Sequence, residues 1–240
     1  MVRLFLPPEF LSSREITITD DNARYLITVL RIRPGELLMV LDGLGNRYLC
    51  RVLGVHKKGV VVEKIERQGY STESPLNIIL AQGIAKGEKM NLIIQKATEL
   101  GVTRVIPLIT ERSQVRHTEK VERWRRIATS ASQQSGREIV PEIEGPLDFN
   151  EFIRQMETGG GIIFFEEERV RNLKQTLNQI RDKREVILLI GPEGGFTDEE
   201  VNQAFERGFM SVSLGPRILR TETATITALS IIQYELGDMG

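Results

Sequence analysis

Short apolar runs alternate with amphipathic helical patterns from Asn77 onward, and this alternation restricts the fold more than any other feature of the sequence. Each run has the length of a single strand, and strands that alternate with helices are typical of a parallel sheet. The expected strands lie in the sequences NIILAQ, RVIPLIT, GIIFFE, VILLIG and SVSLG. We therefore expect an α/β domain in this part of the chain.

Two of the intervening segments have the spacing of helices with one buried face. In GEKMNLIIQKATELG, Gly101 follows at the C′ position, where glycine commonly ends a helix. In EKVERWRRIATSASQQ, Trp124 belongs to the apolar stripe, so we expect its ring to pack in the core and not to stack on a base. The apolar positions of the two faces are Met90, Ile93, Ile94, Ala97 and Leu100, and Val121, Trp124, Ala128 and Ala131.

The N-terminal part of the chain has a different pattern, with short strands that are separated by glycine-containing turns. The expected strands lie in REITIT, GELLMVLDG, NRYLCRVLGV and KKGVVVEKIE, and DDNARYLITVLR is expected to form a helix capped by Asp20 or Asp21. Several strands at close spacing indicate a small barrel. The polar segment RQGYSTESP predicts a boundary, which gives a β domain at residues 1–71 and an α/β domain at residues 72–240.

Composition limits the class of protein. Hydrophobic residues make up 40% and charged residues 27% of the 240 positions, as in an ordinary soluble globular protein. No apolar run approaches the roughly 20 residues that cross a bilayer. The single cysteine, Cys50, excludes an internal disulfide, and no Cys/His spacing indicates a metal site. We expect a cytoplasmic protein with no membrane segment and no metal.

The net charge of −1 conceals an uneven distribution along the chain. Lysine and arginine outnumber acidic residues in segments 24–67 and 112–137, whereas acidic residues dominate segment 138–240. Basic segments favour a polyanionic partner, because lysine and arginine displace counterions from phosphates. The alternative, that these charges are solvated helix faces, is equally consistent with the distribution.

Several familiar signatures are missing from the sequence. The chain has no G-x-x-x-x-G-K-[ST] segment, which excludes a Walker-type phosphate loop. Neither GLGNRY nor GGGIIF has the dinucleotide-binding spacing G-x-G-x-x-G. His56 and His117 lie in polar surroundings without a matching serine or cysteine signature, so a triad hydrolase is not expected.

The sequence VILLIGPEGGFTDEEV predicts a strand, a glycine turn and a helix. Thr197 and Glu200 have the spacing of a capping box, which predicts a helix that starts just after Phe196. Gly194 and Gly195 can adopt positive φ or let a ligand approach the backbone. A tight turn alone would explain the two glycines, but Glu193 is an unusual residue at the C-terminal edge of a sheet, where ligands bind in open α/β folds.

The sequence SLGPRILRTETATITALSII repeats this design. A strand ending at Leu214 is followed by a basic loop with Arg217 and Arg220, and then by an apolar helix that we expect Thr221 or Thr223 to cap. The alternative for Arg220 and Glu222 is a surface ion pair of little consequence. An apolar helix over residues 224–232 predicts burial in the core or in a subunit interface. Glu111, Arg112 and Ser113 follow another expected strand and form a third candidate loop.

GPEGGF and LGPRILRTETA together resemble the RsmE-type bacterial 16S ribosomal RNA (uracil-N3) methyltransferases, which belong to the SPOUT class. The resemblance covers the whole chain, because RLFLP, VLRIRPGE, KGEKMNLIIQKATELGV, ERSQV and SQQSGR follow in the family order. The two late motifs are the specific ones. The sequence departs from the family at Tyr25, shortly before VLR, where a histidine is expected.

The resemblance implies a small N-terminal PUA-like RNA-binding β-barrel and a C-terminal SPOUT-type α/β domain that is threaded into a trefoil knot. It also implies a homodimer with the site near the interface. S-adenosyl-L-methionine would lie bent in the knot, held largely by backbone of loops 189–195 and 214–224, with residues 164–166 as a third contributor. The implied cofactor-binding residues are Leu189, Ile190, Gly191, Pro192, Glu193, Gly194, Gly195, Leu214, Gly215, Ile218, Leu219, Arg220, Thr223 and Ala224.

The activity implied by the resemblance is methylation of N3 of a specific uridine in 16S ribosomal RNA, on the assembled small subunit. We expect Glu222 to be the base, and Arg220, or Arg112 in its place, to stabilise charge on the uracil oxygens. The target base must be unpaired or flipped out, because N3 lies on its pairing edge. The expected RNA-binding residues are Arg3, Arg31, Arg33, Arg112, Arg123, Arg126 and Arg137.

Two other functions are compatible with the sequence. The first is a SPOUT-type methyltransferase that acts on a different RNA or a different atom. The second, from another class, is a non-catalytic RNA-binding or ribosome-assembly factor with a vestigial cofactor pocket. The presence of Glu193, Arg220 and Glu222 beside both glycine turns favours an enzyme over such a factor.

Overall fold

The computed structural model describes residues 1–57, 59–69, 71–156 and 160–240, and these form two compact units. Unit 1 contains Met1–Glu73 together with Ser132–Val140, and unit 2 contains Ser74–Ala131 together with Pro141–Gly240. The chain therefore enters unit 2, returns to unit 1 for one short segment and then completes unit 2. Tyr70, which falls in the predicted boundary segment, lies outside the described residues.

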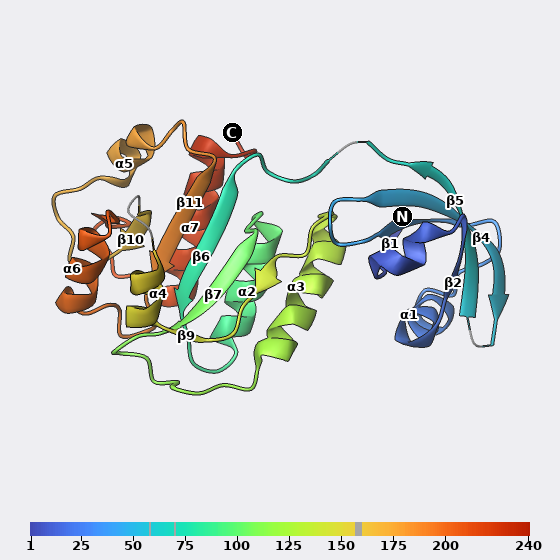
Figure 1. The fold of residues 1–240 in the computed structure, drawn as a ribbon, viewed down its shortest axis with the longest axis horizontal. Coiled ribbons are helices and arrows are strands. Elements are labelled where there is room, and N and C mark those ends of the chain that lie inside the picture. Colours follow the sequence, from blue (N-terminus) through green and yellow to red (C-terminus); the bar gives the residue numbers. More distant parts are fainter. Residues whose placement is uncertain (58, 70, 157–159) are drawn as a thin grey trace. The chain divides into compact units, whose positions relative to one another are not determined.

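Unit 1 is built on a mixed five-stranded sheet with the strand order β1-β3-β4-β5-β2. Its strands are coloured blue to teal in Figure 1. β1 is parallel to β3, and the other neighbouring strands are antiparallel. Alternate side chains of the sheet, such as Leu38, Val40 and Val52, are buried in one cluster, as a half-buried strand requires. The strands are β1 (Val2–Phe5), β2 (Glu15–Ile18), β3 (Leu37–Leu41), β4 (Arg47–His56) and β5 (Gly59–Arg67).

The predicted N-terminal helix is divided into two short elements. After the 3₁₀ helix η1 (Pro8–Ser12) and β2, the chain forms α1 (Asp20–Arg24) and then the π-helix η2 (Tyr25–Val29). Thr19 occupies the N-cap without a side-chain capping bond, so the predicted cap at Asp20 or Asp21 is wrong. Asp20 has a φ of 57° and already belongs to the helix.

Segment 132–140 belongs to unit 1 through two buried ion pairs. Arg137 lies 2.6 Å from Glu73, and its side chain is only 5% exposed. Arg47 lies 3.0 Å from Glu138, and both of these side chains are also largely buried. Glu73 further accepts hydrogen bonds from the backbone N–H groups of Glu138 and Ile139. These contacts hold residues 132–140 against Arg47 and Glu73 of unit 1.

Unit 2 contains a parallel sheet with the strand order β12-β10-β11-β6-β7-β8, and β9 also pairs with β7. The described strands and helices follow one another as predicted for a parallel sheet. The strands are β6 (Asn77–Gly83), β7 (Arg104–Ile109), β8 (Glu142–Ile143), β9 (Leu147–Asp148), β10 (Ile162–Phe164), β11 (Glu185–Ile190) and β12 (Met210–Val212). The helices are α2 (Lys89–Glu99), α3 (Val121–Ser135), α4 (Phe149–Gln155), α5 (Leu173–Gln179), α6 (Asp198–Glu206) and α7 (Thr221–Leu236), and the last four residues of α3 belong to unit 1.

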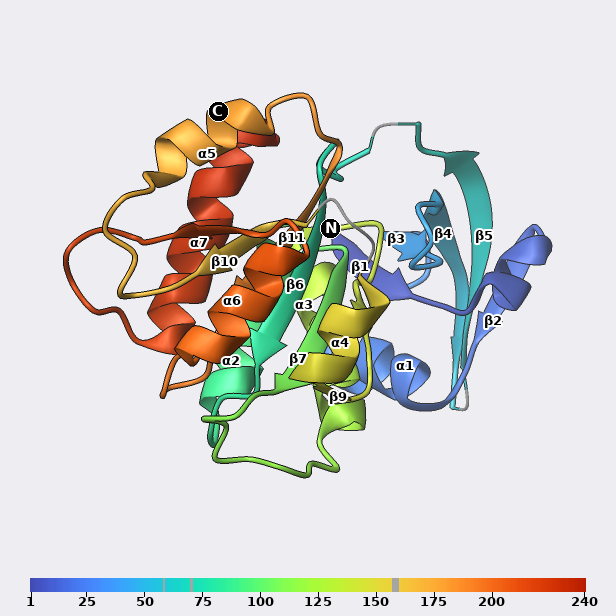
Figure 2. The ribbon, with the colours of Figure 1, turned by 60° about the vertical axis from the view of Figure 1, so that its left-hand side comes forward.

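Helices cover both faces of this sheet (Figure 2). Ile79 and Ala81 of β6 are buried in a cluster with Phe152 of α4 and Ala204 of α6. The intervening residues Ile78 and Leu80 point to the opposite face, because successive strand side chains alternate. α2 and α7 pack against each other, and α7 also contacts β11. None of the helices in the described part of the chain is long and apolar enough to cross a membrane.

Most of the local predictions in unit 2 are confirmed. Each of the five predicted runs contains a strand, although β12 ends at Val212 and not at Leu214. The capping box is present, since the backbone N–H of Glu200 donates to the Thr197 hydroxyl over 3.2 Å. Gly101 follows α2 with a φ of 84°. The predicted cap of the last helix is wrong, because Arg220 is the N-cap of α7 and makes no side-chain capping bond. The trefoil knot stays a prediction.

Candidate active site

A cleft of about 530 Å³ lies where β10, β11 and β12 end. This is the C-terminal edge of the parallel sheet, where open α/β folds bind their ligands. Three loops and the start of α7 form the cleft, and α2 contributes Lys89. The lining residues are Lys89, Phe164, Phe165, Glu166, Ile190, Gly191, Pro192, Glu193, Gly195, Ser213, Leu214, Gly215, Arg217, Ile218, Leu219, Arg220, Thr221 and Ala224.

The structure brings most of the predicted cofactor residues together in this cleft. Those that line it are Ile190, Gly191, Pro192, Glu193, Gly195, Leu214, Gly215, Ile218, Leu219, Arg220 and Ala224. Leu189 does not line it, because its side chain is buried on the α4/α6 face of the sheet. Gly194 lies against Arg112, and Thr223 is exposed on the first turn of α7. The third predicted contributor, segment 164–166, does line the cleft.

The prediction missed Lys89, which reaches the cleft from the start of α2. Its ammonium Nζ lies 2.8 Å from Glu193 Oε1, and the backbone N–H of Lys86 donates to the same oxygen over 3.1 Å. Burial raises the pKa of the Glu193 carboxyl, but the hydrogen bonds from Lys89 and from the backbone outweigh it and leave the pKa below its ordinary value. Glu193 is therefore an ionised, oriented carboxylate at this wall of the cleft.

Close packing explains the glycines of the turn after β11. Gly195 has a φ of 69°, and a side chain there would run into the Glu166 carboxylate. A Cβ on Gly194 would lie 2.9 Å from the Cβ of Arg112. After the turn, Phe196 is buried against Phe149 with the ring centroids 5.7 Å apart. The turn thus places its backbone against the cleft while Phe196 anchors its far end in the core.

Arg112 lies on the outer side of this turn and does not line the cleft. Its guanidinium donates to the carbonyl oxygens of Gly194 and Phe196 over 3.0 and 3.1 Å. Glu200 braces the same region, since its carboxylate accepts from the backbone N–H groups of Glu111 and Thr197. The loop after β7 therefore supports the glycine turn from outside.

The other two catalytic candidates lie at the start of α7. Arg220 lines the cleft, whereas Glu222 does not. Within the described residues, one carboxylate oxygen of Glu222, Oε2, is buried and has no hydrogen-bond partner. A buried acceptor without a donor is costly, and such groups are often functional. No ion pair joins Arg220 to Glu222 in the described part of the chain, so they do not form the surface pair considered above.

The predicted RNA-binding arginines fall into two groups. Arg137 is buried and bound to Glu73, so its guanidinium has almost no exposed surface for a phosphate, and we do not retain it as a contact. Arg123 is exposed but pairs with Glu88 over 2.7 Å. The remaining ones are exposed, namely Arg3, Arg31, Arg33, Arg112 and Arg126.

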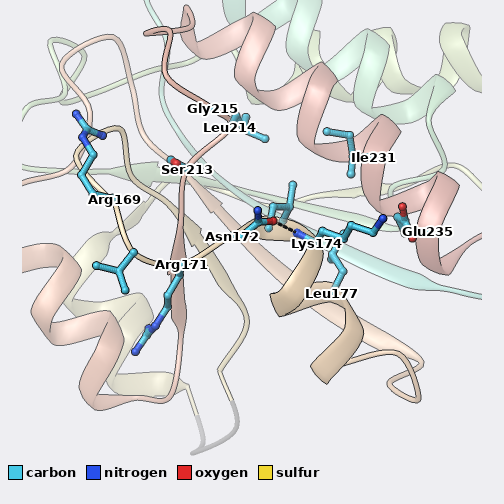
Figure 3. A pocket seen from close by; sticks show the side chains of 12 residues that line it. Arg169, Arg171, Asn172, Lys174, Leu177, Ser213, Leu214, Gly215, Ile231 and Glu235 are labelled. Atoms are coloured by element: carbon cyan, nitrogen blue, oxygen red, sulfur yellow. Dashed lines mark hydrogen bonds between the residues drawn. The ribbon is translucent and has the colours of Figure 1, made fainter.

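A second hollow, of about 490 Å³, shares Ser213, Leu214 and Gly215 with the cleft (Figure 3). Its cations point in different directions. Arg169 donates to the Glu166 carbonyl, Arg171 lies over the Phe205 ring, and the Lys174 side chain extends toward α7 (Figure 3). They do not converge on a common ligand position. Within the described residues, no three His, Cys, Asp or Glu side chains are grouped to hold a metal ion.

Comparison with known proteins places the chain in a family. The RNA methyltransferase domain family matches residues 72–233, and the RNA methyltransferase PUA domain family matches residues 18–65. Ribosomal RNA small subunit methyltransferase E of Synechocystis sp. is 36% identical over 234 residues, which are 96% of this chain and 76% of the relative. This chain belongs to the methyltransferase E family. The methyltransferase E of Bacillus subtilis is 32% identical over 229 residues, which are 91% of this chain and 90% of the relative.

A solved methyltransferase E has the same architecture. The crystal structure of the protein from Neisseria gonorrhoeae, bound to S-adenosyl methionine, aligns with a TM-score of 0.92 and 36% identity, and covers 100% of both chains. The predicted fold, a small N-terminal PUA domain followed by an α/β domain with a parallel sheet, is confirmed. The predicted membership in the methyltransferase E family is confirmed as well.

Proposed function

We propose that this methyltransferase binds S-adenosyl-L-methionine in the cleft and transfers its methyl group to N3 of a uridine in 16S ribosomal RNA of the assembled small subunit. The observation that carries this proposal is the convergence of loops 190–195 and 213–221 on one cleft at the sheet edge. Its volume of about 530 Å³ falls in the range of small-ligand pockets. The Neisseria relative, which covers this whole chain, was solved with the cofactor bound.

The residues of the cleft fit such a cofactor. Ile190, Leu214 and Leu219 provide apolar walls for a purine ring, and the glycine-rich loops expose backbone N–H and C=O groups to its edges. The ionised carboxylate of Glu193 suits a ligand that carries positive charge. The cofactor supplies an electrophilic methyl group, and the protein has to orient the acceptor and to ionise it.

Glu222 and Arg220 are the proposed catalytic residues. Uracil N3–H is a weak acid, so a base has to remove its proton before or during transfer. Within the described residues, one buried carboxylate oxygen of Glu222 has no donor, and we propose that this oxygen accepts the proton. The guanidinium of Arg220, in the cleft wall, would stabilise the charge that develops on the uracil oxygens. Arg112 is bound to the glycine turn, so we assign it support of the cofactor loop.

The exposed arginines are proposed to bind the RNA backbone. Arg3, Arg31 and Arg33 belong to the proposed PUA domain at residues 1–71, and Arg123 and Arg126 belong to the proposed methyltransferase domain at residues 72–240. Phosphate contacts of this kind set affinity and register, whereas the cleft selects the base. The target uridine has to leave its stack to reach the cleft.

The active form is proposed to be a cytoplasmic homodimer. Large apolar side chains are exposed at Ile218 in the cleft wall (86%), at Val170 in the second hollow (88%) and at Tyr234 near the end of α7 (63%). Exposed apolar groups on and beside α7 are typical of a surface that another protein covers. Sedimentation of the purified protein at micromolar concentration should give twice the chain mass of 27.2 kDa. A purely monomeric species would contradict the dimer.

The first experiment is calorimetric titration with S-adenosylhomocysteine, followed by methyl transfer to small subunits that lack the modification. We expect saturable binding near one ligand per chain and 3-methyluridine in the digested RNA. Methyl incorporation at another atom or in another RNA would replace the proposed target while leaving the enzyme class intact. Binding without transfer to any ribosomal substrate would favour a non-catalytic RNA-binding or assembly factor.

A further inference from the structure

Gln82 lies one residue before the end of β6, behind the cleft and not in its wall. Its side chain has no exposed surface. The backbone of Gln82 is paired in register with Ile190, the last residue of β11. A buried glutamine at this position has to satisfy one acceptor and two donors within the protein, because no water reaches it.

The amide of Gln82 satisfies them with groups that belong to both cofactor loops. Its nitrogen Nε2 lies 3.3 Å from the carbonyl oxygens of Ile190 and Gly191, and 3.1 Å from the hydroxyl of Thr221. It also lies 3.0 Å from its neighbour's carbonyl, that of Gly83. The Thr221 hydroxyl in turn donates to Gly191 O over 2.6 Å. One side chain thus joins the end of β11 to the start of α7.

The surroundings leave the amide only one orientation. Carbonyl oxygens cannot donate, so the amide nitrogen has to face them. On the other side, the hydroxyl of Thr225 lies 2.7 Å from Gln82 Oε1 and 2.9 Å from the carbonyl oxygen of Thr221, and its one hydrogen is shared between these two acceptors. A glutamate here would place a carboxylate oxygen against the carbonyls of Gly83, Ile190 and Gly191. The arrangement therefore requires an amide and not merely a polar side chain of the same length.

We infer that Gln82 is a positioning residue for the cofactor cleft, which sets cofactor affinity by holding Ile190, Gly191 and Thr221 in place. These three residues line the cleft, and Gln82 acts through them without touching a ligand. The inference rests on the proposed binding of the cofactor in this cleft. In this arrangement the glycine turns shape the cleft, and the amide of Gln82 fixes the distance between the two loops.

A matched pair of substitutions tests this role. Gln82→Met keeps the length of the side chain and removes its hydrogen bonds. Gln233→Met does the same at the other end of α7, where the buried Gln233 donates to Leu100 O and accepts from Ser74. Both variants lose buried hydrogen bonds that anchor α7 within unit 2, but only Gln82 contacts residues of the cleft.

Calorimetry with S-adenosylhomocysteine should show a Kd that is raised about tenfold for Gln82→Met and unchanged for Gln233→Met. A tenfold rise is the effect expected when one net hydrogen bond that positions the loops is lost. Gln82→Glu should weaken binding more than Gln82→Met. When the cofactor concentration is varied in steady-state assays, Gln82→Met should show a raised KM for the cofactor. At saturating cofactor, its kcat and its KM for RNA should equal the wild-type values. A merely structural role would not produce this split.

A further variant guards against loss of folding in Gln82→Met. Thr225→Val keeps the shape of its side chain and removes the hydroxyl that orients the amide, so it should raise the Kd by a smaller factor in the same direction. Equal weakening by Gln82→Met and Gln233→Met, or wild-type affinity in Gln82→Met or Gln82→Glu, would overturn the inference alone. Failure of the wild-type protein to bind the ligand would instead overturn the proposed cofactor cleft, and this inference with it.

Discussion

Glu222 lies in the first turn of α7 and is partly buried. It follows Arg220, a residue of the cleft wall, by two positions, and its Oε2 is buried without a hydrogen-bond partner among the described residues. A structural carboxylate at a helix start would accept backbone N–H groups there. Among the described residues, no donor reaches Glu222 Oε2, which is the observation behind its proposed role as the base.

The base role of Glu222 predicts a specific kinetic defect. Glu222→Gln keeps the size of the side chain and removes the basic oxygen, so kcat should fall about a hundredfold or more, while the Kd for S-adenosylhomocysteine stays at the wild-type value. Glu206→Gln, an exposed carboxylate on α6, is the matched control and should keep full activity. Normal turnover by Glu222→Gln would exclude the base role.

Glu193 makes stability depend on pH in a defined direction. Its pKa in the folded protein is lower than the ordinary 4.5, so its ion pair with Lys89 stabilises the fold above pH 4.5. This stabilisation is lost as the pH falls from 4.5 through the lowered pKa of Glu193 in the folded protein. Glu193→Gln should therefore be less stable than the wild type at neutral pH, and the difference should vanish on acidification below that window.

Urea unfolding at a series of pH values measures the difference directly. The same substitution in a Lys89→Met background should have a smaller effect at neutral pH, because the partner of the carboxylate is already missing. A stability difference that stays constant down to the acid limit would show that the charge of Glu193 is not responsible.

Among the elements, the glycine turn depends on its neighbours more than its own sequence suggests. Arg112 in the loop after β7 donates to the carbonyls of Gly194 and Phe196, and Gln82 of β6 donates to those of Ile190 and Gly191. Glu200 of α6 joins the same loop to the end of the turn, because it accepts from the backbone N–H groups of Glu111 and Thr197. The turn has few side chains of its own to pack, so its conformation is set by donors that arrive from other strands. This arrangement keeps the backbone of the turn near the cleft while leaving room for a ligand.

Arg112→Met tests whether the hydrogen bonds from Arg112 to the glycine turn affect cofactor binding or the methyl-transfer step. Loss of the bonds to Gly194 O and Phe196 O should lower stability by about 1 kcal/mol and raise the Kd for S-adenosylhomocysteine, while kcat at saturating cofactor is retained. Arg116→Met, which removes bonds to the carbonyls of Thr110 and Glu111 in the same loop, should leave the Kd unchanged. A drop in kcat with unchanged affinity would instead return Arg112 to a catalytic role.

Sequence patterns predicted those parts of the cleft whose conformation depends on residues close together in the chain. The capping box of Thr197 and Glu200 and the strand before it follow from neighbouring residues, and both are present. Lys89 and Gln82 were missed as parts of the site, because their contacts with Glu193 and Thr221 span more than a hundred positions. Arg137 was expected to be exposed for the same reason, since nothing near it in the sequence indicates Glu73 as its partner.

At the scale of the whole molecule, both units are proposed to bind one RNA. A double substitution of Arg31 and Arg33 by alanine, in the proposed PUA domain, should weaken RNA binding. It should also reduce the dependence of log K on log salt by about 0.7 to 0.9 for each phosphate that the variant no longer binds. Filter binding at several salt concentrations measures this slope, with Arg154→Ala, an exposed arginine of α4, as the control. An unchanged slope in the double variant would exclude these two arginines from phosphate binding.

The return of residues 132–140 to unit 1 affects the order in which the protein is made. The buried partners of Glu73 and Arg47 are Arg137 and Glu138, which the ribosome adds only after more than sixty further residues. Translation at roughly 5–20 residues per second delays them by several seconds. During that interval the nascent N-terminal part of the chain lacks the segment that later contacts Glu73 and Arg47. Unit 1 is therefore completed only after residues 74–131, the first part of unit 2, have been made.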